Sequence, residues 1–280
     1  MKEIEIIIVD DGSTDSSGKI CDEYAANDQR IIVIHKSNEG LSSARNDGIK
    51  KSTAPFIMFV DGDDWVEPDF CEAPFRMLCE NNADLLFFSY KKIYNDGTKK
   101  RFEIHHESGV LTEAEAIYFN VFEIWAVWIG LYKREIFDNV IFPDGKLHED
   151  TATTHRFIHE ANKICLLNKS LYNYRVDRLG SIMNAPNTRE HPDLREMLGR
   201  KAIDLFDWGY NDYAQLYALR VLVWYGLQNE DIKKLGEILK SGKASKCFDW
   251  KYLVMFYLYR FSPFIFDKMC RLIRIIKANE

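Results

Sequence analysis

The sequence lacks the spacings and segments that mark several common classes of protein. Its six cysteines are scattered and form no CxxC pair, so neither a disulfide framework nor a zinc site is predicted. It contains no secretory signal and no uninterrupted apolar run long enough to span a bilayer. We therefore expect a cytoplasmic protein whose thiols are free in a reducing compartment.

An excess of basic charge is also missing. The formal net charge of −6 over 280 residues argues against a general nucleic-acid binder. The charge is unevenly spread, because residues 251–280 carry +4 and the remainder carries −10. The apolar fraction of 46% suits a well-packed globular protein, so we expect one large domain or one domain with an appendage.

Strand and helix patterns alternate through the first 90 residues. Such alternation favours an α/β fold with a mostly parallel sheet and right-handed crossovers. From about residue 191 onward the pattern is almost wholly helical, which predicts a division into residues 1–190 and 191–280. The predicted strands are 4–9, 31–35, 56–60 and 85–90, and the predicted helices between them are 16–26, 41–50 and 68–81.

An apolar run at residues 56–60 stops at an acidic cluster that contains Asp61, Asp63 and Asp64. The run has the length of a buried strand, so the carboxylates lie where open α/β sheets bind ligands. Three carboxylates within four residues repel one another unless a cation lies between them. Oxygen ligands favour Mg²⁺, Mn²⁺ or Ca²⁺, of which the first two also hold substrate phosphates. The alternative is a polar turn that ends a strand.

A second predicted strand ends at Asp10 and Asp11, which Gly12 and Ser13 follow. A carboxylate at such a strand end can accept hydrogen bonds from a ribose hydroxyl or a base N–H. The alternative is a turn that caps the next helix and leaves both aspartates on the surface.

Two further residues stand near the starts of predicted helices. Arg45 lies one turn inside a helix, where its guanidinium could reach a phosphate or could pair on the surface with Glu39 or Asp47. Asp150 stands at the start of a helix whose dipole favours the ionised carboxylate, and it could act as a general base. The zinc-protease pattern HExxH is absent there, because position 152 is alanine.

Together, in this order and at this spacing, these motifs resemble family 2 glycosyltransferases with the GT-A fold. The resemblance implies a nucleotide-diphosphosugar donor such as a UDP-sugar, a saccharide or lipid-linked saccharide acceptor, and Mn²⁺ or Mg²⁺. It also implies an inverting single displacement. It extends from the first residue to about residue 182 and rests on segments 6–15, 38–48, 59–64, 149–150, 172–175 and 180–182.

The resemblance assigns four residues to the donor. Asp11 would lie against the nucleobase, with Asp10 nearby. Arg45 would lie beside the nucleotide. Asp64 would help to orient the donor.

The resemblance assigns the remaining acidic residues to the metal and to proton transfer. Asp61 and Asp63 would form the DxD element, with Asp63 the more direct metal ligand and Asp61 nearer the ribose. Asp150 would be the catalytic base that takes a proton from the acceptor hydroxyl. A metal that stabilises the diphosphate leaving group and a separate base are the minimum that this chemistry needs.

The sequence departs from the family pattern at its start. The family usually begins with a strand that carries a Val-Pro-Xaa-Tyr-Asn-like segment and with a following helix. Neither is present here, so we expect a sheet without its first βα unit and a weakened or lost activity. Two alternatives therefore remain, a nucleotidyltransferase and a degenerate, non-catalytic subunit of glycan assembly.

The predicted helices between residues 252 and 276 mix aromatic, aliphatic and basic side chains. A basic amphipathic helix with aromatics suits the surface of an anionic membrane. The alternative is a helical bundle packed on the catalytic domain. Peripheral contact with the inner face of the cell membrane would suit lipid-linked acceptors in capsular, exopolysaccharide or cell-wall polysaccharide biosynthesis.

Overall fold

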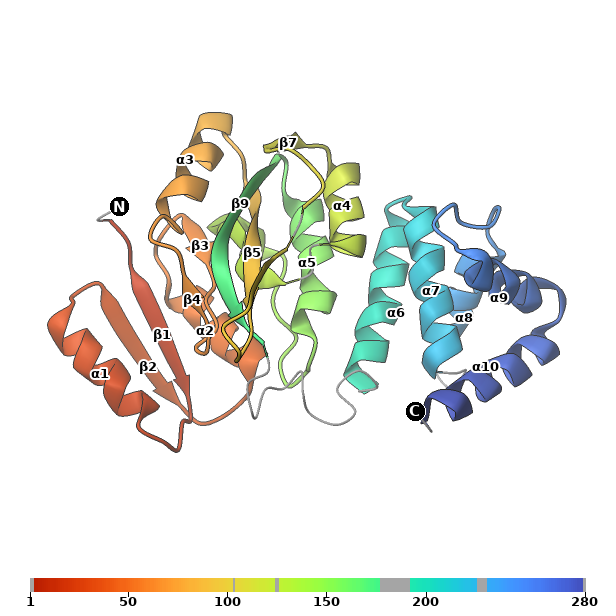
Figure 1. Ribbon diagram of the computed structural model, residues 1–280, viewed down its shortest axis with the longest axis horizontal. Coiled ribbons are helices and arrows are strands. Elements are labelled where there is room, and N and C mark those ends of the chain that lie inside the picture. Colours follow the sequence, from red (N-terminus) through yellow and green to blue (C-terminus); the bar gives the residue numbers. More distant parts are fainter. Residues whose placement is uncertain (1–2, 103, 124–125, 177–191, 226–230, 279–280) are drawn as a thin grey trace. The chain divides into compact units, whose positions relative to one another are not determined.

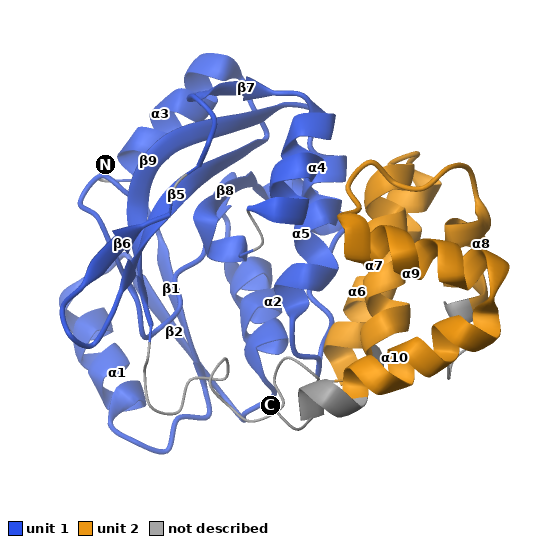
Figure 2. Ribbon diagram, turned by 45° about the vertical axis from the view of Figure 1, so that its right-hand side comes forward, with its two compact units in different colours: residues 1–188 blue, residues 189–280 orange. Residues whose placement is uncertain are grey.

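The computed structural model describes residues 3–102, 104–123, 126–176, 192–225 and 231–278 (Figure 1). The chain divides into two compact units, residues 1–188 (unit 1) and residues 189–280 (unit 2), which have different colours in Figure 2. Unit 1 combines strands and helices, whereas the described part of unit 2 is helical.

The strands of unit 1 form two sheets. The smaller sheet is the parallel pair of β1 (Ile6–Asp11) and β2 (Ile31–Lys36). In the larger sheet the strand order is β3-β8-β5-β9-β4, with β6 paired to β5 and β7 paired to β9. Its strands are β3 (Phe56–Met58), β4 (Trp65–Val66), β5 (Leu85–Ile93), β6 (Lys99–Arg101), β7 (Gly109–Leu111), β8 (Gly130–Lys133) and β9 (Ile164–Arg175).

The larger sheet is mixed, so the prediction of a mostly parallel sheet is wrong. Its strands β5 and β9 are parallel, but β8 is antiparallel to both β3 and β5. It follows that β3 and β5 run in the same direction, as the alternation of strands and helices predicted. A strand from much later in the chain lies between them, and local sequence patterns carry no information about such a long-range pairing.

The core of unit 1 is built around β5, in which residues 85–90 are all buried. A continuous apolar run suits a strand that is covered on both faces. Figures 1 and 2 show β5 and β9 between α3 on one side and α4 with α5 on the other. The helices of unit 1 are α1 (Ser17–Asn27), α2 (Leu41–Lys51), α3 (Glu72–Asn81), α4 (Glu113–Phe122), α5 (Glu149–Glu160) and the 3₁₀ helices η1 (Val127–Ile129) and η2 (Arg134–Asp138).

Unit 2 buries its own apolar core, to which Leu205, Leu219, Leu222 and Leu239 contribute. The prediction of a helical C-terminal region is confirmed for the residues that the structure describes. Its helices are α6 (Pro192–Asp207), α7 (Asn211–Tyr225), α8 (Asp231–Lys240), α9 (Trp250–Phe261) and α10 (Pro263–Ala278).

Among the described residues, no helix has both the length and the apolar character that crossing a membrane requires.

Candidate functional site

The acidic turn after β3 is fastened to β9 through Tyr172. The Tyr172 hydroxyl donates a hydrogen bond to Oδ2 of Asp64 at 2.8 Å and accepts one from the backbone N–H of Asp61 at 3.0 Å. The other Asp64 oxygen accepts the backbone N–H of Arg175 at 2.7 Å. Asp64 is therefore engaged in holding the turn in place, which fixes where Asp61 and Asp63 lie.

Burial is the main influence on the Asp64 carboxyl. It raises the pKa of Asp64 to about 6, against the opposing hydrogen bonds from Arg175 and Tyr172. Repulsion by nearby Asp63 and Asp61 contributes to the same upward shift of the Asp64 pKa. The turn thus places three carboxyl groups within four residues.

Arg45 of α2 is the cation at the centre of the site, and it is buried, with 7% of its surface exposed. Its Nη2 atom lies 2.9 Å from Asp61, and its Nη1 atom lies 3.4 Å from Asp150. Nη1 also forms an ion pair with Glu149. One guanidinium therefore joins the end of β3 to the start of α5.

The guanidinium of Arg45 is enclosed by aromatic rings as well as by carboxylates. Its Cζ atom lies 5.9 Å from the ring centre of Phe59 and 5.5 Å from that of Phe142. Burial alone would lower the pKa of Arg45, but the carboxylates around it raise the pKa instead. The surface pair of Arg45 with Glu39 or Asp47 is therefore wrong, because the side chain is buried and its terminal nitrogens point at other carboxylates. Its contact with a phosphate stays a prediction.

Asp150 is a carboxyl group whose pKa is governed by its burial. Burial raises its pKa well above the ordinary value, repulsion by Glu149 adds to the shift, and Arg45 opposes it. Burial likewise raises the pKa of Asp61. Three carboxylates share one guanidinium, and this excess of negative charge suits a site that receives a further cation.

The loop before α5 is fixed by Asn46, the neighbour of Arg45 on α2. Its side-chain amide donates to the carbonyl of Phe142 at 2.9 Å and to Asp144 at 2.9 Å, and it accepts the backbone N–H of Phe142 at 3.1 Å. The three bonds bring the segment that precedes Asp150 against α2. Sequence reasoning assigned no role to Asn46, although it stands beside Arg45 in the same motif.

Asp10 and Asp11 make their contacts on the β1–β2 side of unit 1. Asp11 accepts the backbone N–H groups of Glu39 at 2.9 Å and Gly40 at 2.8 Å, which holds the loop that leads into α2. Hydrogen bonds from Ser13 and His35 hold the pKa of Asp10 at about 2. Both aspartates thus shape the strand end, and Asp11 positions the start of the helix that carries the central arginine.

Gly12 allows this close approach. Its φ of +76° lies in the left-handed region, and an added Cβ would lie 2.6 Å from the backbone nitrogen of Asn38.

Gly12→Ala is therefore expected to cost roughly 1–3 kcal/mol of stability. Chemical denaturation would measure the loss. Gly109→Ala is the matched control, because nothing lies within 4 Å of its added Cβ and its φ is not positive. Equal effects of the two substitutions would contradict the argument.

Aromatic residues near the site, which in the sequence could either serve in the core or stack on a sugar, lie mostly in the core of unit 1. Trp128 stacks on Tyr172 with ring centres 4.3 Å apart, and Tyr132 is also buried. For these three the core role, which is the more common one for such residues, is confirmed. Trp125 and residues 180–182, the last segment on which the family resemblance rests, lie outside the described residues.

The metal prediction has chemical support but no formed ligand cage. Among the described residues, no group of three or more His, Cys, Asp or Glu side chains converges as metal ligands do. Mg²⁺ commonly binds through one or two carboxylates together with substrate phosphates and water. Asp63, with Asp61 two residues before it, offers that smaller set of carboxylates. The residues present therefore fit a metal that arrives with a phosphorylated ligand.

Comparisons with known proteins identify the class to which this fold and site belong. The profile described as "Glycosyl transferase family 2" matches residues 1–146, more than half of the chain. The chain therefore belongs to glycosyl transferase family 2.

The chain is also similar to two proteins of Streptococcus pneumoniae serotype 4. It is 32% identical over 250 residues to "Glycosyltransferase GlyA", a match that covers 84% of this chain and 35% of GlyA. It is 37% identical over 196 residues to "Glycosyltransferase GlyG", which covers 65% of this chain and 64% of GlyG. The chain thus spans about a third of one relative and less than two thirds of the other.

The structure resembles that of S. aureus TarS residues 1–349, solved in complex with UDP-GlcNAc. The TM-score is 0.72 at 17% sequence identity, and the match covers 99% of this chain and 83% of that one. At this identity the likeness concerns the fold, and it confirms the predicted α/β fold of the GT-A type.

Proposed function

We propose that the protein is an inverting glycosyltransferase that moves a sugar from a nucleotide-diphosphosugar, a UDP-sugar in our interpretation, to an acceptor hydroxyl. The observation that carries this proposal is the buried Arg45, which holds Asp61 and Asp150 on one guanidinium. It joins an acidic strand end suited to a metal-bound diphosphate to a carboxylate suited to proton removal. Membership of glycosyl transferase family 2 and the UDP-GlcNAc bound by TarS support it.

In this proposal Asp63 and Asp61 are the residues that would hold Mn²⁺ or Mg²⁺ when the donor is bound. The bound ion would supply neutralisation of the charge that develops on the departing diphosphate. Asp64, fastened to Tyr172 and Arg175, orients the donor by keeping the turn in one conformation. These residues bind and position the donor, and none of them takes part in proton transfer.

Asp150 acts as the general base. The acceptor oxygen attacks the anomeric carbon opposite the leaving group, so the new carbon–oxygen bond forms as the bond to the phosphate oxygen breaks. The acceptor proton passes to the Asp150 carboxylate, and the nucleoside diphosphate leaves with the bonding electron pair. A raised pKa makes Asp150 a stronger base than an exposed aspartate, while Arg45 favours its ionised form.

Asp10 and Asp11 form the nucleoside end of the proposed donor site. Asp11 acts by holding the 38–40 loop in place, since both of its oxygens accept backbone N–H groups there. The pKa of Asp10 is about 2, so its carboxylate is ionised at neutral pH and can accept a hydrogen bond at the edge of the site. Arg45 contributes to the site by positioning carboxylates beside the nucleotide.

The proposed acceptor is a saccharide or a lipid-linked saccharide in polysaccharide biosynthesis at the cytoplasmic face of the cell membrane. An acceptor with a lipid anchor would give peripheral membrane contact a purpose. The basic charge of residues 251–280 supports such contact with an anionic surface.

Asp63→Ala is expected to reduce metal-dependent hydrolysis or transfer of a UDP-sugar by about 100-fold, because metal binding supplies several kcal/mol of transition-state stabilisation. The assay screens UDP-sugars with Mn²⁺ and repeats the measurement after chelation. Asp138→Ala, which removes an exposed carboxylate of η2, is the matched control and should leave activity unchanged. Full activity of Asp63→Ala would refute the metal assignment.

Two other measurements separate the alternatives. Calorimetry with UDP and Mn²⁺ should show binding to the folded wild-type protein. If it shows none, the non-catalytic subunit becomes the better interpretation. If the protein releases pyrophosphate from a nucleoside triphosphate and a sugar phosphate, it is a nucleotidyltransferase instead.

A further inference from the structure

Helix α9 has an outward stripe of large apolar side chains, to which we refer as the α9 stripe. It consists of Trp250, Val254, Tyr257 and Phe261, which are 70%, 49%, 50% and 79% exposed. Their spacing of four, three and four residues places them on one face of the helix. The opposite face carries Met255 and Phe256, which are buried in unit 2. Helix α9 therefore packs into the core of unit 2 through its other face, and the stripe does not contribute to that core.

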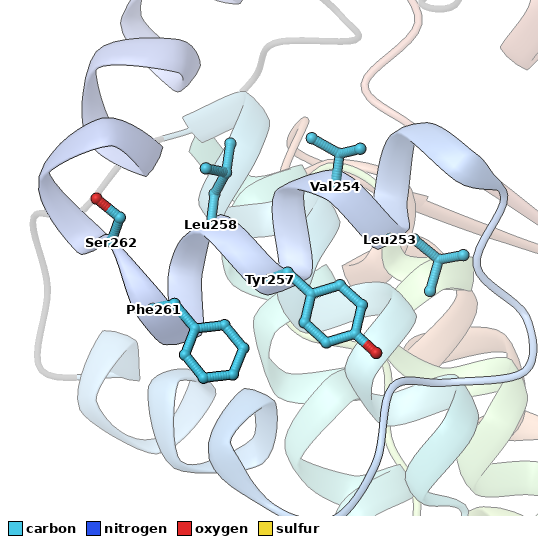
Figure 3. Close-up of a pocket in the computed structure, with 6 residues that line it drawn as sticks. All are labelled: Leu253, Val254, Tyr257, Leu258, Phe261 and Ser262. Atoms are coloured by element: carbon cyan, nitrogen blue, oxygen red, sulfur yellow. The ribbon is translucent and has the colours of Figure 1, made fainter.

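The stripe borders a shallow groove along α9. A cavity of about 420 Å³ is lined by Leu253, Val254, Tyr257, Leu258, Phe261 and Ser262. Figure 3 shows the rings of Tyr257 and Phe261 directed to the same side of the helix. The two rings stack with centres 6.1 Å apart and an angle of 12° between their planes. The groove is thus a predominantly apolar surface.

The apolar side chains continue past the break between α9 and α10. Phe264, 70% exposed, follows Phe261 by three residues across that break, and Ile265 is 48% exposed. Phe261 and Phe264 therefore stand before and after Pro263 in the sequence, and both are largely exposed. Exposed apolar groups gathered in this way mark an interaction site more often than an ordinary surface.

Basic side chains accompany the exposed rings. The Nζ of Lys251 lies 5.7 Å from the ring centre of Trp250, and the Nζ of Lys268 lies 4.5 Å from that of Phe264. Exposed Arg260 stands next to Phe261 in the chain. Lysine and arginine side chains can lay their aliphatic part against apolar groups while their charge reaches lipid phosphates. They therefore suit the boundary between acyl chains and headgroups.

Acidic side chains are scarce in the same segment. Between residues 250 and 274 the sequence has one acidic residue, Asp267, against five basic ones. Asp267 is paired with Arg271 at 2.8 Å, so its charge is largely compensated. The local charge is therefore opposite to that of the rest of the chain, and it complements an anionic surface.

We propose that the α9 stripe, together with Phe264, docks on the surface of an anionic lipid bilayer. Phe261 and Phe264 enter the acyl boundary, while Lys251 and Lys268 meet lipid phosphates. The aromatic stripe supplies apolar burial and the cations supply the preference for anionic lipid, which are the two components that interfacial binding needs. The proposal rests on the membrane contact suggested under the proposed function and adds the residues that make it.

Vesicle binding of the full chain tests the proposal without a sugar donor, so its failure would leave the transferase proposal intact. Wild-type protein should sediment with vesicles of phosphatidylcholine and phosphatidylglycerol much more than with phosphatidylcholine alone. Phe261→Glu should weaken binding to the anionic vesicles by at least about tenfold. Ile141→Glu is the matched control, because Ile141 is 70% exposed in unit 1 and lies outside the α9 stripe.

The charge component has its own variant. Lys251→Glu combined with Lys268→Glu should weaken binding to anionic vesicles and leave the weak binding to phosphatidylcholine unchanged. Chemical denaturation of each variant confirms that it folds. Equal binding by wild type and Phe261→Glu, or no binding by wild type, would overturn the proposal. If the protein forms a concentration-dependent dimer that Phe261→Glu abolishes, the stripe binds a second copy of the chain. If Phe261→Glu lowers the stability of unit 1, the stripe packs within this chain. Either result would also overturn the membrane proposal.

Discussion

Arg45→Met is expected to lower the stability of unit 1 by about 3–5 kcal/mol at neutral pH. The substitution keeps most of the apolar stem between Phe59 and Phe142 but removes the guanidinium. Asp61, Glu149 and Asp150 would then remain close together in a buried region without their shared cation. A buried charge without a partner is among the few causes of so large an effect from one substitution.

The loss should shrink as the pH falls. Burial already raises the pKa of Asp61 and Asp150 in the folded protein, and removal of Arg45 raises both further. Above the pKa of an unfolded carboxyl, the folded variant then binds more protons than the unfolded chain, so its stability increases on acidification. Chemical denaturation at neutral pH and at about pH 5 measures the difference.

Arg30→Met is the matched control for this prediction. Arg30 pairs with Asp28 at 2.7 Å, but both side chains are partly exposed. An exposed pair of this kind contributes about 0–1 kcal/mol, so the same chemical change should have a small effect there. If both variants lose the same stability, the central role given to Arg45 is wrong.

Local sequence patterns predicted the elements that depend on near neighbours. The Thr-x-x-Glu pattern at Thr112 and Glu115 indicates a capping box, and the two side chains form one at the start of α4. The Asn-Asp-Gly sequence at residues 95–97 indicates a hairpin turn, and it joins β5 to β6 with Gly97 at a φ of +82°. The strand that ends before Asp61 lies where its apolar run indicated, as β3. Each of these signals is complete within a few residues, so a single sequence suffices.

The partners within the site are determined by contacts between distant parts of the chain. Arg45 stands 16 residues before Asp61 and 105 before Asp150, and Tyr172 lies 108 residues after Asp64. Periodicity shows where an arginine stands on a helix but not which carboxylates meet it. The surface pairing considered for Arg45 failed for this reason, and so did the expectation of a mostly parallel sheet, because β8 inserts antiparallel between β3 and β5.

Asp150→Asn is expected to reduce the rate of sugar transfer by about 10²–10⁴-fold, the usual contribution of a general base. Asparagine has nearly the same shape and can still accept a hydrogen bond from Arg45, but it cannot take up the acceptor proton. Donor affinity should change little, because the proposed donor ligands lie on the turn after β3 and at the end of β1 and do not include Asp150. Transfer kinetics, combined with calorimetry for UDP and Mn²⁺, separates the two steps.

The fold should tolerate this substitution, which makes the result interpretable. A carboxyl whose pKa is raised on folding opposes stability at neutral pH, so neutralising Asp150 should leave the protein at least as stable as the wild type. A functional carboxylate held at a cost in stability is the common pattern at active sites. Loss of transfer by Asp150→Asn would then reflect lost chemistry and not unfolding.

Glu149→Gln is the control that distinguishes the base from its neighbour. It removes the same charge from the same guanidinium, since Glu149 also pairs with Nη1 of Arg45. Because Glu149 is given no part in proton transfer, this variant should retain transfer within about tenfold of wild type, a change attributable to a small misplacement of Asp150. If Glu149→Gln abolishes transfer while Asp150→Asn retains it, then Glu149 is the base and the assignment of Asp150 is wrong.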